Sequence, residues 1–329
     1  MVVTTTLPRS CPSPVDAPAP RPTVSVVIPC HTAARWNGLA AAVRSALSQT
    51  LRPLEVVVAV DHTPELLDRV RAELPEVRAV LNTGARGASG TRNAGAAVAR
   101  GEVLAFLDDD TRAAPTWLAG LVSALVEVTG TVGVGGRVSG DWPGGSAPRW
   151  FPEEFLWAVG VSHRGLPSNR GPVRNVWSEN MALWRDAFTR SGGFRDGFGK
   201  VGSDSRPEDT ELCIRVAHET GRSWTYAPDA QVVHTVPAAR ATWPFFVRRC
   251  WAEGRGKAEL AALSGGGALG DERTHVLVAV PRGVLRDLGA AVHGDGWGIA
   301  RAGTAVVGVL AAAGGLLTAR TARRATRPR

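Results

Sequence analysis

The stretch GEVLAFLDDD, residues 101–110, decides the fold. Its apolar run at 103–107 has no polar face, which is typical of a strand buried inside a sheet. The run leads directly to Asp108, Asp109 and Asp110. Three adjacent carboxylates repel one another unless water or a cation lies among them. The sequence therefore predicts a polar site where a buried strand ends.

Similar runs surround this stretch. A β-branched run at 24–28 and an apolar run at 56–60 predict two more buried strands, and Leu39, Val43 and Leu47 recur between them at a helical spacing. This alternation predicts an α/β fold with a mostly parallel, Rossmann-like central sheet flanked by helices. Further strands are expected at 77–81, 131–138, 176–184, 224–226 and 232–233, and further helices at 64–74, 94–99, 115–128 and 208–219.

Polar residues fall where these strands end. Cys30-His31-Thr32 and Asp61 follow two strands as the aspartates follow a third, and ligands bind beyond the carboxyl ends of strands in such sheets. The aspartate run suits Mg²⁺ or Mn²⁺, which prefer oxygen ligands. A polar turn or a helix N-terminus explains the run equally well. Residues 141–174 are expected to form long loops that shape an acceptor site.

Two later features are also ambiguous. Glu208 and Asp209 open a predicted helix, where acidic residues stabilise the helix dipole; a carboxylate there could equally be a general base for a hydroxyl group. His234 follows the short strand at 232–233. Such a histidine is usually structural or exposed, and it is also a common metal ligand.

The order and spacing of these motifs resemble those of the family 2 glycosyltransferases, which are inverting enzymes of the GT-A fold. The resemblance covers about residues 23–240. It is carried by the segments VSVVIP (24–29), VVAVD (57–61), GTRNAG (90–95), GEVLAFLDDD (101–110), ENMALWR (179–185), GGF (192–194) and EDTEL (208–212).

The resemblance implies a donor site. Pro29 and Asp61 would line the nucleotide-base pocket, and Arg86 falls where relatives place a basic residue near the base. Asp108 and Asp110 match the DxD element that binds a divalent metal and the donor, with Asp109 between them on the donor side.

It also implies the catalytic and acceptor sides of the site. Asp209 matches the candidate general base, and Glu208 supports it. His234 matches a histidine that completes the metal site together with Asp108 and Asp110, whereas Gly193 and Phe194 belong to a loop that faces the acceptor.

The implied reaction is an inverting, metal-dependent transfer of a sugar from a UDP- or GDP-sugar to an acceptor hydroxyl. The cofactor would be Mg²⁺ or Mn²⁺, and the acceptor a glycan, a lipid-linked sugar or a small molecule. Two segments depart from the family pattern: His62-Thr63-Pro64 replaces a second acid and a Gly-Ser turn, and Cys30-His31-Thr32 replaces Tyr/Phe-Asn. The first departure predicts an altered base pocket.

Three other functions compete with this one. A degenerate, membrane-associated protein could bind nucleotide sugars without activity, although the site residues are present together. An NAD(P)-dependent oxidoreductase is disfavoured because no GxGxxG motif follows the first strand. A nucleotidyltransferase would need a glycine-rich basic loop at the same place, where residues 29–33 read PCHTA.

The composition limits the partners and the compartment. Of the net charge of +8, five charges come from arginines among the last ten residues, so the body is not expected to bind nucleic acid. Cys11, Cys30, Cys213 and Cys250 have no metal-binding or disulfide spacing, which suits a cytoplasmic protein.

The C-terminal part changes character. Residues 302–319 form an uncharged stretch of 18 residues ahead of the arginine tail, which predicts a membrane-associated helix at the inner face of the plasma membrane. A helix packed on the enzyme's own surface is the alternative. The expected parts are a disordered segment at 1–22, a GT-A catalytic domain at 23–240, a helical C-terminal extension at 241–297, and an apolar helix with a basic tail at 298–329.

Overall fold

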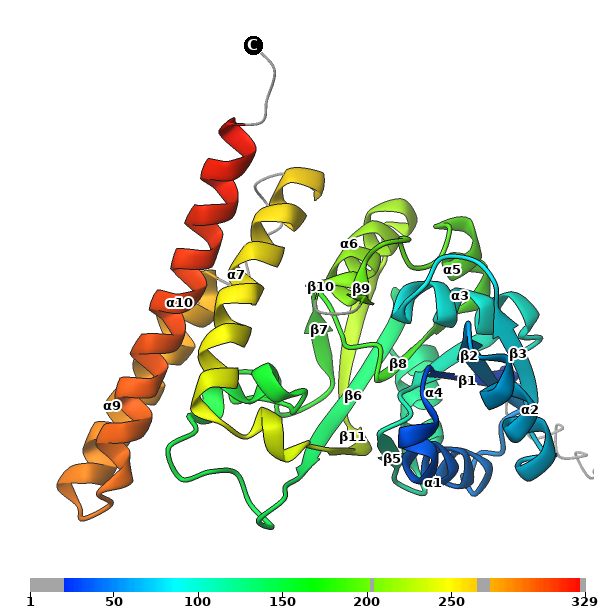
Figure 1. Cartoon of the computed structure of the whole chain (residues 1–329), viewed down its shortest axis with the longest axis horizontal. Helices are drawn as coiled ribbons and strands as arrows, with labels where there is room; N and C mark the ends of the chain where they lie inside the picture. The colour runs from blue at the N-terminus through cyan, green and yellow to red at the C-terminus, as the bar shows by residue number, and fades with distance from the viewer. Residues whose placement is uncertain (1–20, 202–203, 265–272, 326–329) are drawn as a thin grey trace, which may run out of the picture.

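The computed structural model describes residues 21–201, 204–264 and 273–325 of the 329-residue chain. The segment predicted to be disordered, 1–22, lies almost wholly outside the described residues, as does the end of the basic tail at 326–329. The described part has a sheet covered by helices, with a layer of long C-terminal helices on one side of it (Figure 1).

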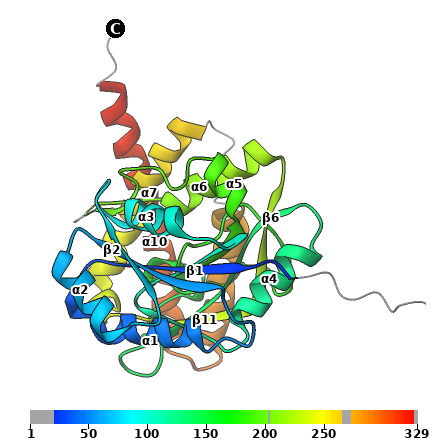
Figure 2. The ribbon, with the colours of Figure 1, turned by 90° about the vertical axis from the view of Figure 1, so that its right-hand side faces the viewer.

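Parallel strands form the N-terminal half of the sheet, in the order β3-β2-β1-β4. Val26 of β1 packs against α1, whereas Val27 packs on the opposite face among residues of α3. Helices on both faces explain why the strand sequences are apolar throughout, and Figure 2 shows α1 and α3 on opposite sides of β1. The elements are β1 (Val24–Cys30), η1 (Ala33–Arg35), α1 (Trp36–Leu47), β2 (Glu55–Asp61), α2 (Pro64–Glu73), β3 (Arg78–Asn82), α3 (Ala88–Val98) and β4 (Val103–Leu107).

Beyond β4 the sheet becomes mixed. β8 runs antiparallel to β4 and β6, β11 returns parallel to β6, and β5 and β7 pair antiparallel with β11. The predicted α/β class is confirmed, with antiparallel strands added to its parallel half. The elements are β5 (Thr111–Ala113), α4 (Trp117–Glu127), β6 (Thr131–Asp141), η2 (Glu153–Val159), β7 (Gly171–Val173), β8 (Asn180–Trp184), α5 (Arg185–Arg190), β9 (Gly199–Val201), β10 (Asp204–Arg206), α6 (Glu208–Thr220) and β11 (Ser223–Thr235).

The two short strands predicted at 224–226 and 232–233 are wrong as separate elements. They are one strand, β11, which pairs with β6 along its whole length. Its register shifts between Ala227 and Gln231, so Pro228, Asp229 and Ala230 bulge out of the ladder. A bulge needs no ladder hydrogen bond from proline, which has no N–H to donate. The prolyl and aspartyl residues thus resemble a strand end in sequence without ending the strand.

The C-terminal layer consists of long helices with small residues at their contacts. A Cβ atom added to Gly254 of α7 would lie 1.9 Å from the carbonyl oxygen of Ala312, and one added to Gly315 of α10 would lie 2.1 Å from that of Trp251. The two backbones therefore touch. The elements are η3 (Ala238–Arg240), α7 (Trp243–Ser264), η5 (His275–Ala279), α9 (Val280–Val292) and α10 (Trp297–Ala325).

We expect Gly254→Ala to lower the midpoint of thermal unfolding, because its methyl group can be accommodated only if α7 and α10 move apart. Gly303→Ala is the matched control on α10, since an added Cβ there meets nothing within 4 Å. It should raise stability by about 1 kcal/mol through helix propensity. Differential scanning fluorimetry of both variants checks this, and equal midpoints would contradict the close contact.

Candidate active site

The polar residues expected at strand ends lie along one edge of the sheet. Asp61 closes β2, and the aspartate run follows β4. β8 runs in the opposite direction, so the residue before it, Glu179, reaches the same edge. His234, near the end of β11, pairs with Thr111 of β5 directly after the aspartates. The sheet topology therefore brings residues that are far apart in sequence to one place.

A buried arginine holds the centre of this edge. Arg92 lies on α3 with 4% of its side chain exposed; its Nη2 donates to Asp108 Oδ1 at 2.6 Å, and its Nη1 donates to Glu208 Oε1 at 3.5 Å. Burial by itself would lower the pKa of Arg92, but the charges of Asp108, Glu208 and Asp209 raise it. The guanidinium also lies over the ring of Phe194, 5.6 Å from its centroid. Arg92 therefore joins the aspartate run to the start of α6.

A second arginine neutralises the rest of the aspartate run. Arg35 Nη1 donates to Asp109 Oδ1 at 2.8 Å and lies 3.1 Å from Asp110 Oδ2. Its approach depends on Gly38, because a Cβ there would lie 2.7 Å from the carbonyl oxygen of Asp109. Burial raises the pKa of Asp109 to about 7, although Arg35 acts in the opposite direction. Asp109 thus points into the protein, whereas Asp108 and Asp110 are only partly buried.

Glu179 and His234 form a buried pair beside the aspartates. His234 Nδ1 lies 3.1 Å from Glu179 Oε2. Burial lowers the pKa of His234, while burial and the charges of Asp108, Asp110 and Asp209 raise that of Glu179 well above its ordinary value. The resemblance had matched Glu179 only as part of a motif and gave it no role. The one sequence feature that could have indicated a role for Glu179 is its position directly before a buried strand.

The residues at this edge fit a divalent metal ion. Burial lowers the pKa of His234, and its Nε2 is buried with no hydrogen-bond partner in the described part of the chain. The charges of Asp108 and Asp110 act on this imidazole. The two carboxylates suit both Mg²⁺ and Mn²⁺, and the imidazole favours the transition metal Mn²⁺ over Mg²⁺. Among the described residues, no three such side chains are already gathered as a metal cluster, and Asp110 is paired with Arg35.

Glu208 and Asp209 form the first turn of α6, where the helix dipole favours acidic side chains. Burial raises the pKa of Glu208 to about 8, assisted by the charge of Asp209. Burial also raises the pKa of Asp209, whereas Arg92 and hydrogen bonds from Ser178 act to lower it. Asp209 Oδ1 is buried and has no hydrogen-bond partner among the described residues. A buried carboxylate oxygen of this kind is available to accept a proton.

The donor side predicted around Asp61 is a network of hydrogen bonds. The Gly87 N–H donates to Asp61 Oδ2 at 3.0 Å, and Asn82 Nδ2 donates to Oδ1 at 2.9 Å. Burial raises the pKa of Asp61, but these bonds and that of His62 together lower it. No role was predicted for Asn82, and Arg86 lies exposed in the loop after β3.

His62, which follows Asp61 and bonds to its carboxylate, has an unusual backbone conformation. His62 Nδ1 lies 2.8 Å from Asp61 Oδ1, and the His62 backbone has a φ of 49°. A residue other than glycine in this region is strained, and strain of this kind persists where the surroundings enforce it. The segment at 62–64, which departs from the family sequence pattern, therefore begins with a strained backbone. Pro29 lies half-buried on β1, one strand away.

The loop predicted to face the acceptor is held by core packing. Phe194 has 1% of its surface exposed, and its ring packs against those of Phe106 and Phe188. Asn93 fixes this loop: its Nδ2 donates to the Phe194 carbonyl, and its Oδ1 accepts from the Phe194 N–H. Gly193 has a φ of 70°, and a Cβ there would lie 2.6 Å from Asn93 Oδ1. The loop thus places the Phe194 ring against the guanidinium of Arg92.

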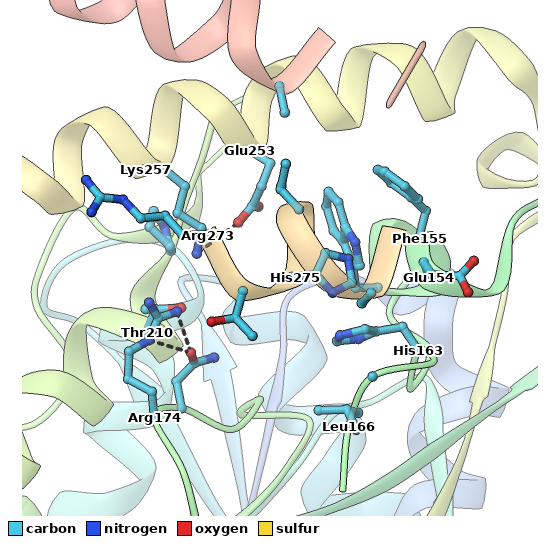
Figure 3. Close-up of a pocket in the computed structure, with 18 of the residues that line it drawn as sticks. Glu154, Phe155, His163, Leu166, Arg174, Thr210, Glu253, Lys257, Arg273 and His275 are labelled. Atoms are coloured by element: carbon cyan, nitrogen blue, oxygen red, sulfur yellow. Dashed lines mark hydrogen bonds and ion pairs between the residues drawn. The ribbon is translucent and has the colours of Figure 1, made fainter. Parts of the chain in front are cut away.

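A cleft of about 1490 Å³ opens beside Glu208 and Asp209 and extends along α7, η5 and α10. Among the described residues that line it, arginine and lysine outnumber aspartate and glutamate by nine to four. Figure 3 shows Lys257, Arg273 and Arg174 toward one end and Phe155 at the other. The sequence predicted a helical extension without its role as a wall of this cleft.

The family model described as Glycosyl transferase family 2 matches residues 25–191, just over half of the chain. A curated relative, glucosyl-dolichyl phosphate glucuronosyltransferase of Haloferax volcanii, is 34% identical over 238 residues, which are 71% of this chain and 76% of that protein. The chain belongs to glycosyltransferase family 2. Succinoglycan biosynthesis protein ExoM of Rhizobium meliloti is 29% identical over 236 residues, 67% of this chain and 72% of that protein. The predicted enzyme class, a glycosyltransferase, is confirmed.

Solved structures agree with the fold of this family 2 glycosyltransferase. A mannosyltransferase from Pyrobaculum calidifontis, in complex with GDP-Man and Mn²⁺, aligns with a TM-score of 0.55 and 20% identity over 93% of this chain and 91% of that chain. GalNAc-T7 with UDP, GalNAc and Mn²⁺ aligns with a TM-score of 0.51 and 19% identity over 78% of this chain and 54% of that one. The predicted GT-A fold is confirmed.

We expect Arg92→Met in this glycosyltransferase to lower the free energy of unfolding by about 3–5 kcal/mol, because it leaves the partly buried carboxylates of Asp108 and Glu208 without their cation. Arg92→Lys should cost less, since it keeps the charge but not the fork geometry.

Arg190→Met removes an exposed ion pair with Asp186 and should leave stability nearly unchanged. Urea titration of the three variants checks the comparison. Equal free energies of unfolding for Arg92→Met and Arg190→Met would show that Arg92 is not a central support.

Proposed function

We propose that this family 2 glycosyltransferase transfers a sugar from a nucleoside-diphosphate donor to an acceptor hydroxyl, with inversion at the anomeric carbon and with Mg²⁺ or Mn²⁺ as cofactor. One observation carries the proposal: Arg92 joins Asp108, at the donor edge, to Glu208 at the start of α6, beside the cleft. Donor and acceptor groups would therefore meet where the carboxylates converge.

The donor half is assigned to the edge formed by β1, β2 and β4. Asp61 would accept hydrogen bonds from the nucleotide base, with Pro29 and the exposed Arg86 beside it. The bonds to Asp61 from Asn82 and the Gly87 N–H keep its carboxylate ionised and oriented. The relatives solved with GDP-Man and with UDP support a nucleotide donor.

The metal half is assigned to Asp108, Asp110 and His234, with Asp109 as a buried support. Bound there, a divalent cation would supply positive charge to the diphosphate leaving group. The unpaired Nε2 of His234 supports this assignment, as does the Mn²⁺ in the two solved relatives. Arg35 would give up its contact with Asp110 and keep Asp109.

Asp209 is assigned as the general base. Its free Oδ1 would take the proton of the acceptor hydroxyl as the oxygen attacks the anomeric carbon in line with the leaving group. Arg92 and Ser178 favour the ionised form against the effect of burial. Glu208 would act by positioning Arg92.

The acceptor is assigned to the cleft, and its chemistry favours a lipid-linked sugar with an anionic group. The excess of basic side chains would bind phosphate, and apolar residues of η5 and α10, such as Leu277 and Leu316, line the same space. The name of the Haloferax volcanii relative contains glucosyl-dolichyl phosphate, a sugar linked to a lipid phosphate. We accordingly assign residues 23–240 to catalysis and 241–329 to the acceptor and the inner face of the plasma membrane.

We expect Asp209→Asn to reduce turnover by about 10²–10⁴-fold, since the amide cannot accept the proton, while donor binding stays close to wild type. Turnover is measured as release of nucleoside diphosphate from a panel of UDP- and GDP-sugars. Asp196→Asn, an exposed acid outside the site, is the control. Near wild-type turnover of Asp209→Asn would rule out its role as base.

We expect Asp110→Ala to weaken Mn²⁺-dependent binding of UDP or GDP by at least the ~10–100-fold that the loss of a supporting group costs a metal site. Calorimetry with and without Mn²⁺ measures this, with Asp141→Ala as the control on the exposed end of β6. If Mn²⁺ strengthens nucleotide binding equally in both variants, Asp110 is not a metal ligand.

A further inference from the structure

Exposed apolar side chains are unevenly distributed over the protein. Among the described residues, sixteen large hydrophobic side chains are exposed, and fourteen of them lie after residue 242. Leu54 and Val126 are the other two. Contiguous exposed apolar surface of this kind marks a binding surface on a water-exposed protein. The exposed apolar surface of the described residues is therefore concentrated on the C-terminal helices.

The apolar residues of α10 lie on two faces with different neighbours. One face consists of small residues, and Gly308 and Gly315 on it contact Phe155, Phe246 and the backbone of α7. The opposite face exposes Ile299, Val306, Leu310 and Leu317, which are 67%, 48%, 65% and 60% exposed. Spacings of seven and four residues place these four side chains on one side of a helix.

The helix before α10 continues this surface. Leu285, Leu288 and Val292 on α9 are 70%, 43% and 85% exposed, again at a helical spacing. α9 is fixed to α10 by Arg301, which lies 3.0 Å from the buried Asp287. Figure 1 shows α9 and α10 together at the outer edge of the molecule, on the side away from the sheet.

We propose that the exposed face of η5, α9 and α10 binds a lipid bilayer in the membrane plane, with α10 lying on the membrane and not crossing it. By length and composition, α10 could span a bilayer from Trp297 to Ala322. A spanning α10 would have to leave α7, where its backbone touches that of Trp251, and would uncover Phe155 and Phe246. Both contacts keep it on the surface of the enzyme.

The charges around this face favour a bilayer with anionic lipid as the partner. From Gly296 to the C-terminus the chain contains no aspartate or glutamate, whereas Arg320 is exposed at the end of α10 and further arginines follow it. Each arginine near an anionic surface contributes about 1 kcal/mol to binding. A second copy of the chain would present the same positive charge and so would be repelled.

Bilayer binding would place lipid at the entrance of the cleft. Val276, Leu277 and Val278 of η5 are exposed, and they also line the cleft beside Asp209. An apolar chain carried in the bilayer would therefore reach the cleft without crossing water. The membrane surface itself does not depend on the proposed reaction, because it can be measured without donor or acceptor.

Flotation of the full chain with vesicles of phosphatidylcholine, with and without the anionic lipid phosphatidylglycerol, tests the surface, because anionic lipid attracts basic segments. We expect binding to the anionic vesicles, and a loss of at least about tenfold in the variant Leu285→Ser/Val292→Ser/Leu310→Ser. Leu54→Ser/Val126→Ser is the control, since it removes exposed apolar residues elsewhere and should bind normally. Failure of the wild type to float, or equal binding by both variants, would overturn the surface.

The depth of α10 distinguishes in-plane binding from a span. A fluorophore is attached to a single introduced cysteine at position 299, 310 or 317. The labelled chain carries Cys11→Ser, and Cys30, Cys213 and Cys250 are buried, so the label reacts at the introduced cysteine. Positions 299 and 317 are about 27 Å apart along the helix, close to the ~30 Å core of a bilayer. Lipid-borne quenchers should report one shallow depth for all three positions.

A position 310 that lies deeper in the bilayer than positions 299 and 317 would overturn in-plane binding in favour of a spanning helix. A dimer in light scattering that the triple substitution dissociates would overturn the bilayer as the partner. Vesicle binding by a protein that releases no nucleotide from any sugar donor would contradict the proposed function and leave the membrane surface intact.

Discussion

The site depends on a buried cation among carboxylates. Arg92, with 4% of its side chain exposed, pairs with Asp108 and Glu208, and so connects the end of a sheet strand to the start of α6. The desolvation cost of a buried arginine is large, and it is offset here only because several carboxylates lie around it. The same arginine lies over Phe194, whose loop is fixed by Asn93. Through Arg92, the charge balance of the site therefore depends on the conformation of this loop and on the packing of the core beneath it.

The sequence predicted the parallel half of the fold well, because β1, β2 and β4 are buried on both faces and read as uninterrupted apolar runs. It failed at β11, where Pro228 and Asp229 bulge out of a continuous strand. Local pattern carries information on burial and turn formation, but a bulge is decided by pairing with a distant strand. The antiparallel pairing of β8 on both sides was hidden for the same reason.

Predictions for the site also succeeded only where the local sequence pattern carries the information. Asp61, Asp108 and Asp110 were predicted as site residues because strand ends are visible in the sequence. Glu179 and Asn82 are recognised only from the residues that they contact. The motif that contains Phe194 predicts a loop on the acceptor side, but it gives no sign that the ring of Phe194 is in the core. Arg35 was missed because no sequence pattern links it to the aspartates, which it reaches only where Gly38 lets α1 approach.

The walls of the cleft have an evolutionary consequence. The edge around Asp61 and the aspartate run comes from the first third of the chain, whereas much of the wall of the cleft comes from α7, η5 and α10. Substitutions that reshape the wall of the cleft need not disturb the edge of the sheet, because Arg92 and α6 lie between them. Descendants of this gene could change the molecule that receives the sugar while keeping the molecule that delivers it. Recombination near residue 242 would exchange the two preferences as separate traits.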